Sequence, residues 1–588
     1  MMFKMFKNLT KKEIVFFLFS IVFIVVQVLA DLKIPDYMQE ITVLVQTEGS
    51  VIGDVLVQGG YMLACAFVSL VSAVIVGYFA AYIGTSFEKH LRSKIFNKVA
   101  DFGMEEIKDF STSSLITRST NDVTQVKMFV VLAIQMLIKA PIMAAIAIGK
   151  IANKGWEFSL ITGIGVGVVL VMVVILILLV LPKFKLVQKL LDKINGLTRE
   201  NLTGIRVIRA YNAEEYQQNK FDKVNCELNK IQQFNQKTMA FMSPVMSSVM
   251  SGLSLSIYWV GAYLINQAAL IDKMTIFGNM VTFSSYAVQV IMSFVMLVML
   301  FIIYPRASVS AKRINEVLET EPHMTDGTID VDTTDKKGEV EFKNVSFKYP
   351  DAEEYILENI SFKAKKGETV AFIGSTGSGK STLINLIPRF YDATEGQVLV
   401  DGVDVKEMKR EYLNDKLGYI AQKAVMFKGT IKSNIMLGKS KSGKPDEKKI
   451  KDAIRVAQAS DFVDAKEEGI ESSIAQGGTN VSGGQKQRLS IARAIARDPE
   501  IYIFDDSFSA LDYKTDFALR EDLKKYTREA TVLIVAQRIG TIKDADKIVV
   551  LDAGKCVGLG THKELLKSCE VYREIASSQL TKEELENA

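Results

Sequence analysis

Long apolar runs alternate with polar stretches through the first 305 residues of the chain. Six runs are predominantly apolar and lie at residues 14–30, 55–83, 128–148, 158–181, 239–265 and 277–304. A helix needs about 20 apolar residues to cross a bilayer, and every run except the first meets that length. The apolar positions between 34 and 45 can extend the first run. Because backbone amides in lipid must be paired within their own segment, the pattern predicts six membrane-spanning helices.

The polar connections between these runs differ in length and charge. Two long connections have a helical pattern and cover residues 84–127 and 183–237. The other three connections are short and lie near residues 31–54, 150–156 and 267–273. They contain few basic residues or are acidic. The N-terminus and residues 89–98 are basic, and the positive-inside rule places such segments in the cytoplasm. We therefore expect a multi-pass protein of the cell membrane with cytoplasmic termini and two helical projections on the same side.

The first run has a second interpretation, because a basic N-terminus followed by an apolar run ending in "VLA" resembles a secretory signal. The run is longer than a usual signal core and five more apolar runs follow it, so we interpret it as a retained first helix. In the last two runs methionines recur at helical spacing, at Met242, Met246, Met250, Met292, Met296 and Met299. They form either an adaptable wall for apolar cargo or ordinary helix packing, and we favour packing.

The composition changes after residue 318. Residues 319–338 are polar without apolar periodicity, which is typical of a surface linker. We expect a transmembrane domain at 1–318, this linker, and an α/β domain ending in helices at 339–588. The 71 basic and 67 acidic residues leave a net charge of only +4, so a nucleic-acid partner is not indicated. The four cysteines are scattered and form neither a metal-binding spacing nor a disulfide framework.

The motif "VAFIGSTGSGKSTLINLI" predicts a buried strand, a glycine-rich turn and an amphipathic helix. It matches the phosphate loop G-x-x-x-x-G-K-[ST], whose glycines let successive amides turn towards phosphate oxygens. Lys380 would reach the β and γ phosphates of ATP, and the Ser381 hydroxyl would bind Mg²⁺. The expected nucleotide-binding residues are Gly374, Ser375, Thr376, Gly377, Ser378, Gly379, Lys380, Ser381 and Thr382.

Two further segments fit the same chemistry. "IYIFDD" is a buried strand that ends in Asp505, a candidate for the magnesium shell. "VSGGQKQRLSIARAIA" places a serine and two glycines before a helix, which is a second site suited to an anion. A single ATP site does not need two separate γ-phosphate-binding segments from one chain. In a head-to-tail dimer both are used, because the second segment of each chain contacts the nucleotide bound to the phosphate loop of the other.

Together these segments resemble the ATP-binding cassette (ABC) family over nearly the whole chain, and the order of parts is similar to bacterial exporter half-transporters. The resemblance implies that Tyr349 stacks on adenine, that Gln422 senses Mg²⁺ and touches the membrane domain, and that Asp512 ends a loop at the dimer interface. Val481 replaces the usual leucine before the signature motif. The signature would contact the partner's ATP through Ser482, Gly483, Gly484 and Gln485.

The resemblance also extends to the two projections. Residues 198–215, "TRENLTGIRVIRAYNAEE", resemble the projection that enters the opposite cassette in this family. Residues 113–123, "SSLITRSTNDV", resemble the first projection.

Two positions depart from the family pattern. The catalytic base of the family is glutamate, but Asp506 occupies that position here, and its oxygens stop one methylene short of the attacking water. A general base needs contact at about 2.6–3.2 Å, and a displacement near 1 Å can cost on the order of a hundredfold in rate. The family's switch histidine is here Gln537, which can hydrogen-bond a γ-phosphate but cannot carry an imidazole's proton.

Both departures fall in one site whose other groups are intact, which predicts a site that binds Mg-ATP and seldom cleaves it. We therefore expect a heterodimer, in which a second ABC half-transporter supplies an intact glutamate and histidine. Multidrug-type export of small amphipathic compounds is the expected function. The alternatives are a homodimeric exporter of lipid or peptide and an ATP-gated regulatory membrane protein. A soluble cassette ATPase acting on DNA ends is opposed by the six apolar runs.

Overall fold

The computed structural model describes residues 10–47, 49–152, 156–268, 270–332, 334–438, 446–581 and 585. Within them the chain forms two compact units. The first, here called the helical unit, contains the residues before 101 and those from Thr112 to Thr320. The second, the α/β unit, combines Asp101–Ser111 with the residues from Glu321 onwards.

The helical unit contains six helices that are long and apolar enough to cross a membrane, counted over the described residues. They cover Lys11–Gln46, Ile52–Ala100, Thr112–Ala152, Trp156–Thr203, Glu214–Gln267 and Lys273–Glu319. The prediction of six spans is confirmed. Each predicted apolar run lies within one of these helices, including the extension of the first run beyond residue 34.

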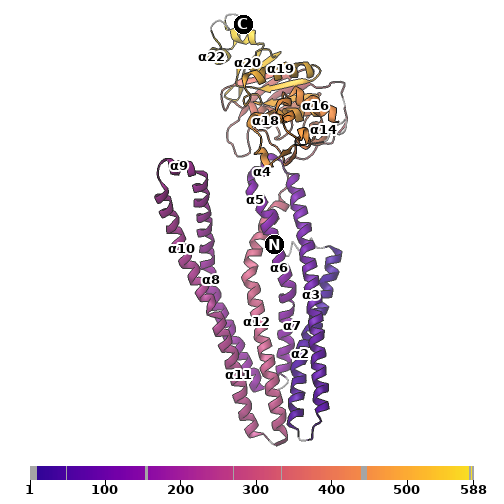
Figure 1. The fold of residues 1–588 in the computed structure, drawn as a ribbon, viewed down its shortest axis with the longest axis vertical. Coiled ribbons are helices and arrows are strands. Elements are labelled where there is room, and N and C mark those ends of the chain that lie inside the picture. The colour runs from indigo at the N-terminus through magenta and orange to yellow at the C-terminus, as the bar shows by residue number, and fades with distance from the viewer. Residues whose placement is uncertain are drawn as a thin grey trace. The chain divides into compact units, whose positions relative to one another are not determined.

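Within this unit the helices are α2 (Lys11–Gln46), α3 (Ile52–Ala100), α5 (Thr112–Thr117), α6 (Val123–Leu132), α7 (Lys139–Ala152), α8 (Trp156–Thr203), α9 (Ile205–Ala210), α10 (Glu214–Ala240), α11 (Met242–Gln267) and α12 (Leu270–Glu319). Two π-helical turns, Arg118–Asp122 and Ala133–Leu137, interrupt the third span. Helix α2 begins with a capping box, in which the Glu13 carboxylate accepts from the backbone of Thr10 at 2.6 Å. In Figure 1, α2, α3, α7 and α12 run side by side.

Two of the expected short connections are shorter than predicted. Helix α2 continues to Gln46 and α3 begins at Ile52, so the acidic residues Asp31 and Asp36 lie inside a helix and not in a loop. Lys150 likewise belongs to α7. The prediction was wrong there because charged side chains were taken as the ends of the apolar segments. In the structure Asp36 pairs with Lys150, and Asp31 pairs with Lys139 of the same helix α7.

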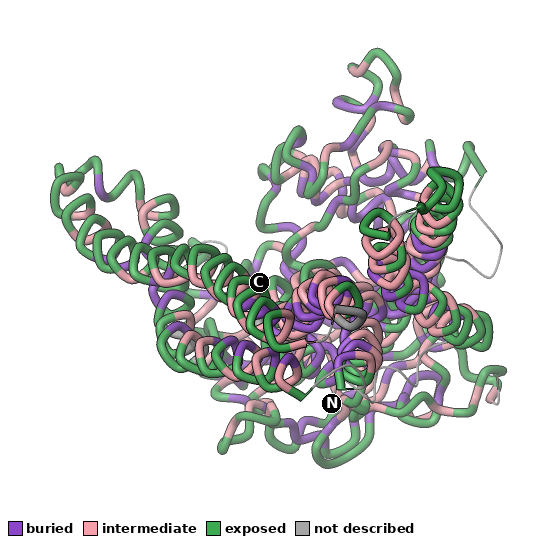
Figure 2. The backbone as a smooth tube through the Cα atoms, turned by 90° about the horizontal axis from the view of Figure 1, so that it is seen from below, coloured by how far each residue is buried: buried purple, intermediate pink, exposed green. Residues whose placement is uncertain are grey.

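Both long polar connections are helical. Residues 183–203 complete α8, and α10 runs back beside it after the short helix α9 (Figure 1). Residues of this hairpin are predominantly exposed, as the green tube in Figure 2 shows. The first connection turns at helix α4 (Met104–Phe110), which belongs to the α/β unit. Residues 113–123 lie beyond that turn, where Arg118 donates to the Glu316 carboxylate at 2.9 Å.

Two sheets form the framework of the α/β unit. The smaller has the order β2 (Leu357–Ala364), β1 (Val340–Phe347), β4 (Glu395–Val400), β5 (Val403–Asp404) and is antiparallel. The larger has the order β12 (Lys555–Gly560), β11 (Lys547–Asp552), β3 (Thr369–Gly374), β10 (Thr531–Val535), β9 (Ile501–Asp505), β6 (Leu417–Ile420), with β12 alone antiparallel. Strands β9 and β10 are buried throughout, as is typical of a parallel sheet covered on both faces. The α/β fold class is confirmed.

The expected linker is attached to the α/β unit. Ile329 forms a parallel bridge with Met408, and the Ile329 carbonyl accepts from the Lys409 amide at 2.8 Å. Asp332 pairs at 2.8 Å with Lys416, whose side chain is almost fully buried. The first residue of the predicted linker, Glu319, still belongs to α12, and acidic residues further along attach the segment to the α/β unit.

Candidate nucleotide-binding site

The candidate site lies where parallel strands of the larger sheet end together. Val535 of β10 is in register with Phe372 of β3 on one side and with Asp505 of β9 on the other. Ile420 of β6 is in register with Phe504 of β9. The residues that follow these strands are consequently gathered along one edge of the sheet, where ligands bind in open α/β sheets.

The loop after β3 has the conformation that its glycines permit. Gly377 and Gly379 have φ angles of 87° and 93°, in the left-handed region that other residues rarely adopt. A Cβ atom on Gly379 would lie 2.7 Å from Leu357 Cδ2 and 3.1 Å from the Ile356 carbonyl oxygen. Helix α13 (Lys380–Asn385) follows at once. A side chain at position 379 would therefore displace the loop from β2.

Lys380 is folded into this loop. Its Nζ donates to the carbonyl oxygens of Gly374 and Ser375 at 2.8 and 2.6 Å, and to Ser378 Oγ at 3.2 Å. Only 8% of the residue is exposed. Burial lowers the pKa of the ammonium, although Asp506 and Asp505 partly oppose the shift. The charge thus lies at the centre of the loop, where phosphate oxygens would compensate for its lost hydration.

The two candidate magnesium ligands are in direct contact. The Ser381 hydroxyl donates to Asp505 Oδ1 at 2.8 Å. Burial raises the pKa of the Asp505 carboxyl, and this hydrogen bond acts in the opposite direction. A hydroxyl and a carboxylate this close fit a Mg²⁺ ion, which takes one or two protein oxygens and completes its shell with phosphate and water.

Asp506 accepts hydrogen bonds from two other candidate site residues, Gln537 and Gln422. Its Oδ2 accepts from Gln537 Nε2 at 2.8 Å and more weakly from Gln422 Nε2 at 3.4 Å. Its φ of 46° is in the left-handed region, and its amide donates to the Val535 carbonyl at 3.0 Å. Burial raises the pKa of its carboxyl, while the hydrogen bonds and Lys380 lower it.

Tyr349, the candidate adenine contact, lies on the loop after β1. Its hydroxyl is 3.1 Å from Thr382 Oγ1, at the start of α13. Its ring makes edge contacts with Phe347 and Tyr391, with centroids 5.0 and 5.2 Å away. Lys108 of α4 places its Nζ 5.6 Å from the centre of the same ring. The hydroxyl contact ties this aromatic ring to the phosphate loop.

The signature residues occupy another part of the unit. Ser482 caps helix α18 (Gly483–Arg497) by accepting from the Gln485 amide at 3.3 Å, and the Gln485 side chain returns a bond to the Ser482 amide at 3.0 Å. A Cβ on Gly484 would lie 3.3 Å from the Ala510 carbonyl oxygen. Among the described residues, no hydrogen bond joins this group to the phosphate loop.

Asp512 caps a helix of its own chain. It accepts from the Thr515 amide at 3.0 Å at the start of α19 (Tyr513–Tyr526). That bond lowers the pKa of its carboxyl. Among the described residues, the signature and Asp512 therefore form a second group, which has no hydrogen bond to the residues around Lys380.

Ion pairs inside the helical unit were not foreseen from the sequence. Lys150 of α7 pairs with Asp36 of α2 and lies 3.0 Å from the hydroxyl of Tyr286, which donates to Asp36 at 2.5 Å. Asp31 accepts from Lys139 at 3.3 Å. Charged residues within apolar helices could have signalled such pairs, because they are rare there and usually compensate one another.

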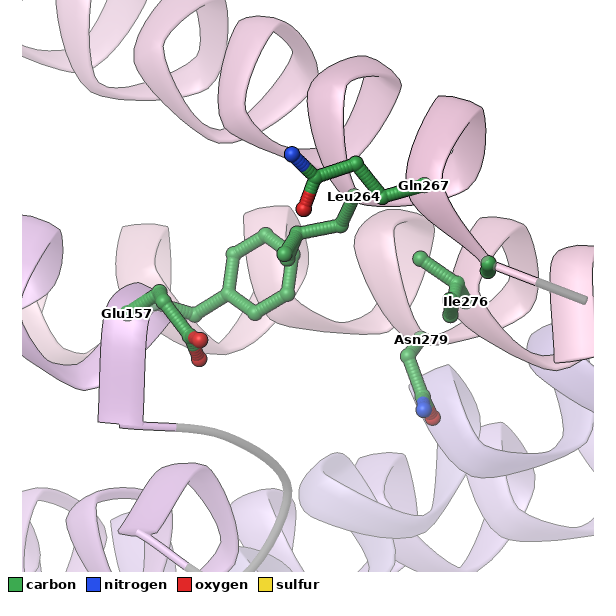
Figure 3. Close-up of a pocket in the computed structure, with 7 residues that line it drawn as sticks. Glu157, Leu264, Gln267, Ile276 and Asn279 are labelled. Carbon is green, nitrogen blue, oxygen red and sulfur yellow. The ribbon is translucent and has the colours of Figure 1, made fainter.

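A cavity of about 330 Å³ also lies in this unit, among α8, α11 and α12 (Figure 3). Its wall combines apolar and polar side chains and includes Glu157, Phe158, Leu264, Gln267, Ile276 and Asn279. The amide nitrogen of Gln267 donates to the Tyr263 hydroxyl at 2.7 Å, which leaves its oxygen as an acceptor. Asn279 accepts from Gln39 at 2.9 Å.

Comparison with known proteins agrees with this arrangement. The family model described as ABC transporter transmembrane region matches residues 17–294, and the family model described as ABC transporter matches residues 357–509. The uncharacterized ABC transporter ATP-binding protein Rv1273c of Mycobacterium tuberculosis is 37% identical over 547 residues, which cover 92% of this chain and 93% of the relative. The putative multidrug export ATP-binding/permease protein YgaD of Bacillus subtilis is 30% identical, with 85% of each chain covered.

The fold is shared with a bacterial Atm1-family ABC exporter whose structure was solved with ATP bound. The TM-score is 0.80 at 20% identity, with 97% of this chain and 99% of that chain covered. The chain thus belongs to the ABC transporter family. It is a multi-pass membrane protein that carries its transmembrane region and its ATP-binding domain on one polypeptide, which implies transport coupled to ATP.

Proposed function

We propose that this chain is one subunit of a heterodimeric ABC exporter, in which its own ATP site binds Mg-ATP and hydrolyses it slowly. The observation that carries this proposal is the hydrogen bond from Gln537 to Asp506, formed beside an intact phosphate loop. The termini and the α/β unit would lie in the cytoplasm. Hydrolysis would occur mainly at the site completed by the partner's glutamate and histidine.

The residues around the phosphate loop fit a triphosphate and its metal ion. Lys380 is buried among carbonyl oxygens and would exchange them for the β and γ phosphates. Ser381 and Asp505 would hold Mg²⁺, with Gln422 near it, and Tyr349 would stack on the adenine. ATP supplies the binding energy that draws two cassettes together and the phosphoanhydride that is cleaved to separate them.

Slow hydrolysis follows from what surrounds Asp506. A general base must accept a proton from water at about 2.6–3.2 Å, and aspartate is one methylene shorter than the glutamate usual in this position. Its Oδ2 already accepts from two amides, so this oxygen is less available to take a proton from water. Gln537 can donate to a γ-phosphate but cannot relay a proton.

The exposed tip of the α8–α10 hairpin is an argument for a second subunit. Leu202, Val207, Tyr211 and Tyr216 are each between 61% and 80% exposed there. Apolar and aromatic side chains gathered at the end of a helical projection mark an interaction site. Leu202, Val207 and Tyr211 lie within residues 198–215, the segment that we expect to enter the partner's cassette, and Tyr216 directly follows it.

Small amphipathic compounds are the proposed cargo. The cavity beside Glu157 combines apolar walls with a carboxylate and amide groups, which suits molecules with an apolar body and a polar group (Figure 3). The name of the relative YgaD, a putative multidrug export protein, points to the same class.

Purification of the intact complex would test the proposal. We expect mass spectrometry to identify a different ABC half-transporter as companion, and we expect nucleotide trapping to find ATP retained at the site of this chain while ADP forms at the other. A complex that contains only this chain and forms ADP equally at both sites would instead establish the homodimeric alternative. Uphill accumulation of a fluorescent amphiphile in sealed inverted vesicles would separate an exporter from an ATP-gated channel.

A further inference from the structure

The C-terminal helix α22 (Glu570–Gln579) packs beside the loop that carries Gln537. Tyr572 and Ala576 of α22 are fully buried, and they share one core cluster with Ile539 and Ile542 of the short helix α20 (Ile539–Ile542). The helix is therefore fixed against the segment that directly follows β10 and Gln537.

Gln579, the last residue of α22, forms two hydrogen bonds with the backbone of this loop. Gln579 Nε2 donates to the Gln537 carbonyl oxygen at 2.8 Å, and Gln579 Oε1 accepts from the Ile539 amide at 2.8 Å. Between them Arg538 is extended, with φ −108° and ψ 128°. In an extended segment the carbonyl of one residue and the amide of the second next point to the same side, so a single carboxamide can bond both.

This clamp needs a donor and an acceptor on one side chain, and the Gln579 carboxamide supplies both. A carboxylate could accept from Ile539 but could not donate to Gln537, and an apolar side chain could do neither. The N-cap residue Arg538 makes no side-chain bond to α20, so Gln579 provides the side-chain acceptor for Ile539. Arg520 of α19 donates to the Gly540 carbonyl at 2.9 Å and so fixes the residue after Ile539.

The clamp is connected to the candidate hydrolysis site by a short chain of bonds. Gln579 holds the backbone of Gln537, and the side chain of Gln537 donates to Asp506 at 2.8 Å. Movement of the loop by a fraction of an ångström would therefore change what the Gln537 amide can reach, because hydrogen bonds weaken steeply outside their narrow range of distance and angle.

We propose that Gln579 is a positioning residue for nucleotide recognition, which holds Gln537 where its amide can bond the γ-phosphate of ATP. This inference rests on the proposed role of Gln537 at the γ-phosphate. It makes the C-terminal helix part of the mechanism that distinguishes ATP from ADP.

The test compares the affinities of Mg-AMP-PNP and Mg-ADP by calorimetry, with the full-length chain purified in detergent. Gln579→Ala should lower the ratio of the two affinities about fivefold, the effect of one ordinary hydrogen bond, and leave ADP affinity unchanged. Gln579→Glu should lower the ratio by a similar factor, because it lacks the donor to Gln537. Ser578→Ala is the matched control, since its hydroxyl donates to Ile575 within the same helix, and it should change nothing.

A double-variant cycle with Gln537→Ala shows whether Gln579 acts through Gln537. We expect Gln579→Ala to have no further effect on the affinity ratio in the Gln537→Ala background. Additive effects would overturn the inference, and so would an unchanged ratio in Gln579→Ala when Gln537→Ala lowers it. An unchanged ratio in Gln537→Ala itself would overturn the proposed γ-phosphate contact.

Hydrogen exchange gives a second readout for variants with altered folding. Exchange of the Ile539 amide should accelerate in Gln579→Ala and remain slow in Gln579→Glu, which keeps the acceptor. Equal protection of this amide in all variants would contradict the clamp.

Discussion

Gln537 and Asp506 are hydrogen-bonded at 2.8 Å across the ends of two neighbouring parallel strands. Their pairing joins the two positions at which this chain departs from its family, so the short acid and the amide are parts of one local structure. The left-handed backbone of Asp506, with φ of 46°, directs its carboxylate to the amide groups of Gln537 and Gln422. Under the proposed function, binding of a triphosphate and weak hydrolysis would have separate structural causes at adjacent positions.

Lys380 should contribute strongly to nucleotide binding. Lys380→Ala removes a buried ammonium aimed at the phosphate site, so we expect ATP affinity to fall by roughly 10- to 100-fold, the range for hydrogen bonds to charged groups. Equilibrium binding of a fluorescent ATP analogue would measure this change. The exposed Lys366 on the preceding turn offers a control, and Lys366→Ala should bind normally. A loss below twofold in Lys380→Ala would contradict the assigned loop.

Asp506→Asn should stabilise the protein in the absence of nucleotide, most clearly at neutral pH. Burial raises the pKa of Asp506 and of Asp505, so the folded state binds protons more tightly than the unfolded state. Stability contributed by such protonation is lost as pH rises through the raised folded-state pKa values. At pH 7.5 the variant should gain about 1 kcal/mol, roughly 2–4 °C in unfolding midpoint.

The difference between Asp506→Asn and the wild type should shrink as the pH falls through the raised pKa of Asp506, because protonation then removes the charge in the wild type. Differential scanning calorimetry of both proteins would measure this trend. An equal difference above and below this pKa would show that the change in stability has another cause.

Local patterns predicted much of this structure. The phosphate loop, the strand ending in Asp505 and the six spans are each specified by consecutive residues, so periodicity and motif spacing located them. The contacts of Gln579 with the Gln537 loop join residues 40 or more positions apart, and Asp36 and Lys150 are separated by 114 positions. No local pattern encodes such pairs, because they depend on how elements pack.

The ion pair between Asp36 and Lys150 should be important for the stability of the helical unit. Asp36→Ala leaves the half-buried ammonium of Lys150 without its carboxylate, and we expect a loss of about 1.5–3 kcal/mol, the range for a hydrogen bond to a charged group. Replacing both residues, as Asp36→Leu with Lys150→Met, should recover most of this loss because no isolated charge remains. Thermal stability in detergent would compare the variants.

Lys33→Ala is a suitable control for the ion pair. Lys33 is more exposed and lies 3.8 Å from the same carboxylate, so its removal should cost little. If the double variant were as unstable as Asp36→Ala, packing and not charge pairing would explain the effect.

The most direct test of weak hydrolysis is single-turnover cleavage of ATP by the purified full-length chain, self-paired and without a companion. We expect slow cleavage that Asp506→Asn reduces less than threefold. Asp506→Glu should accelerate it by on the order of tenfold or more, because the longer side chain reaches the water. Fast cleavage by the wild-type chain that collapses in Asp506→Asn would contradict this expectation.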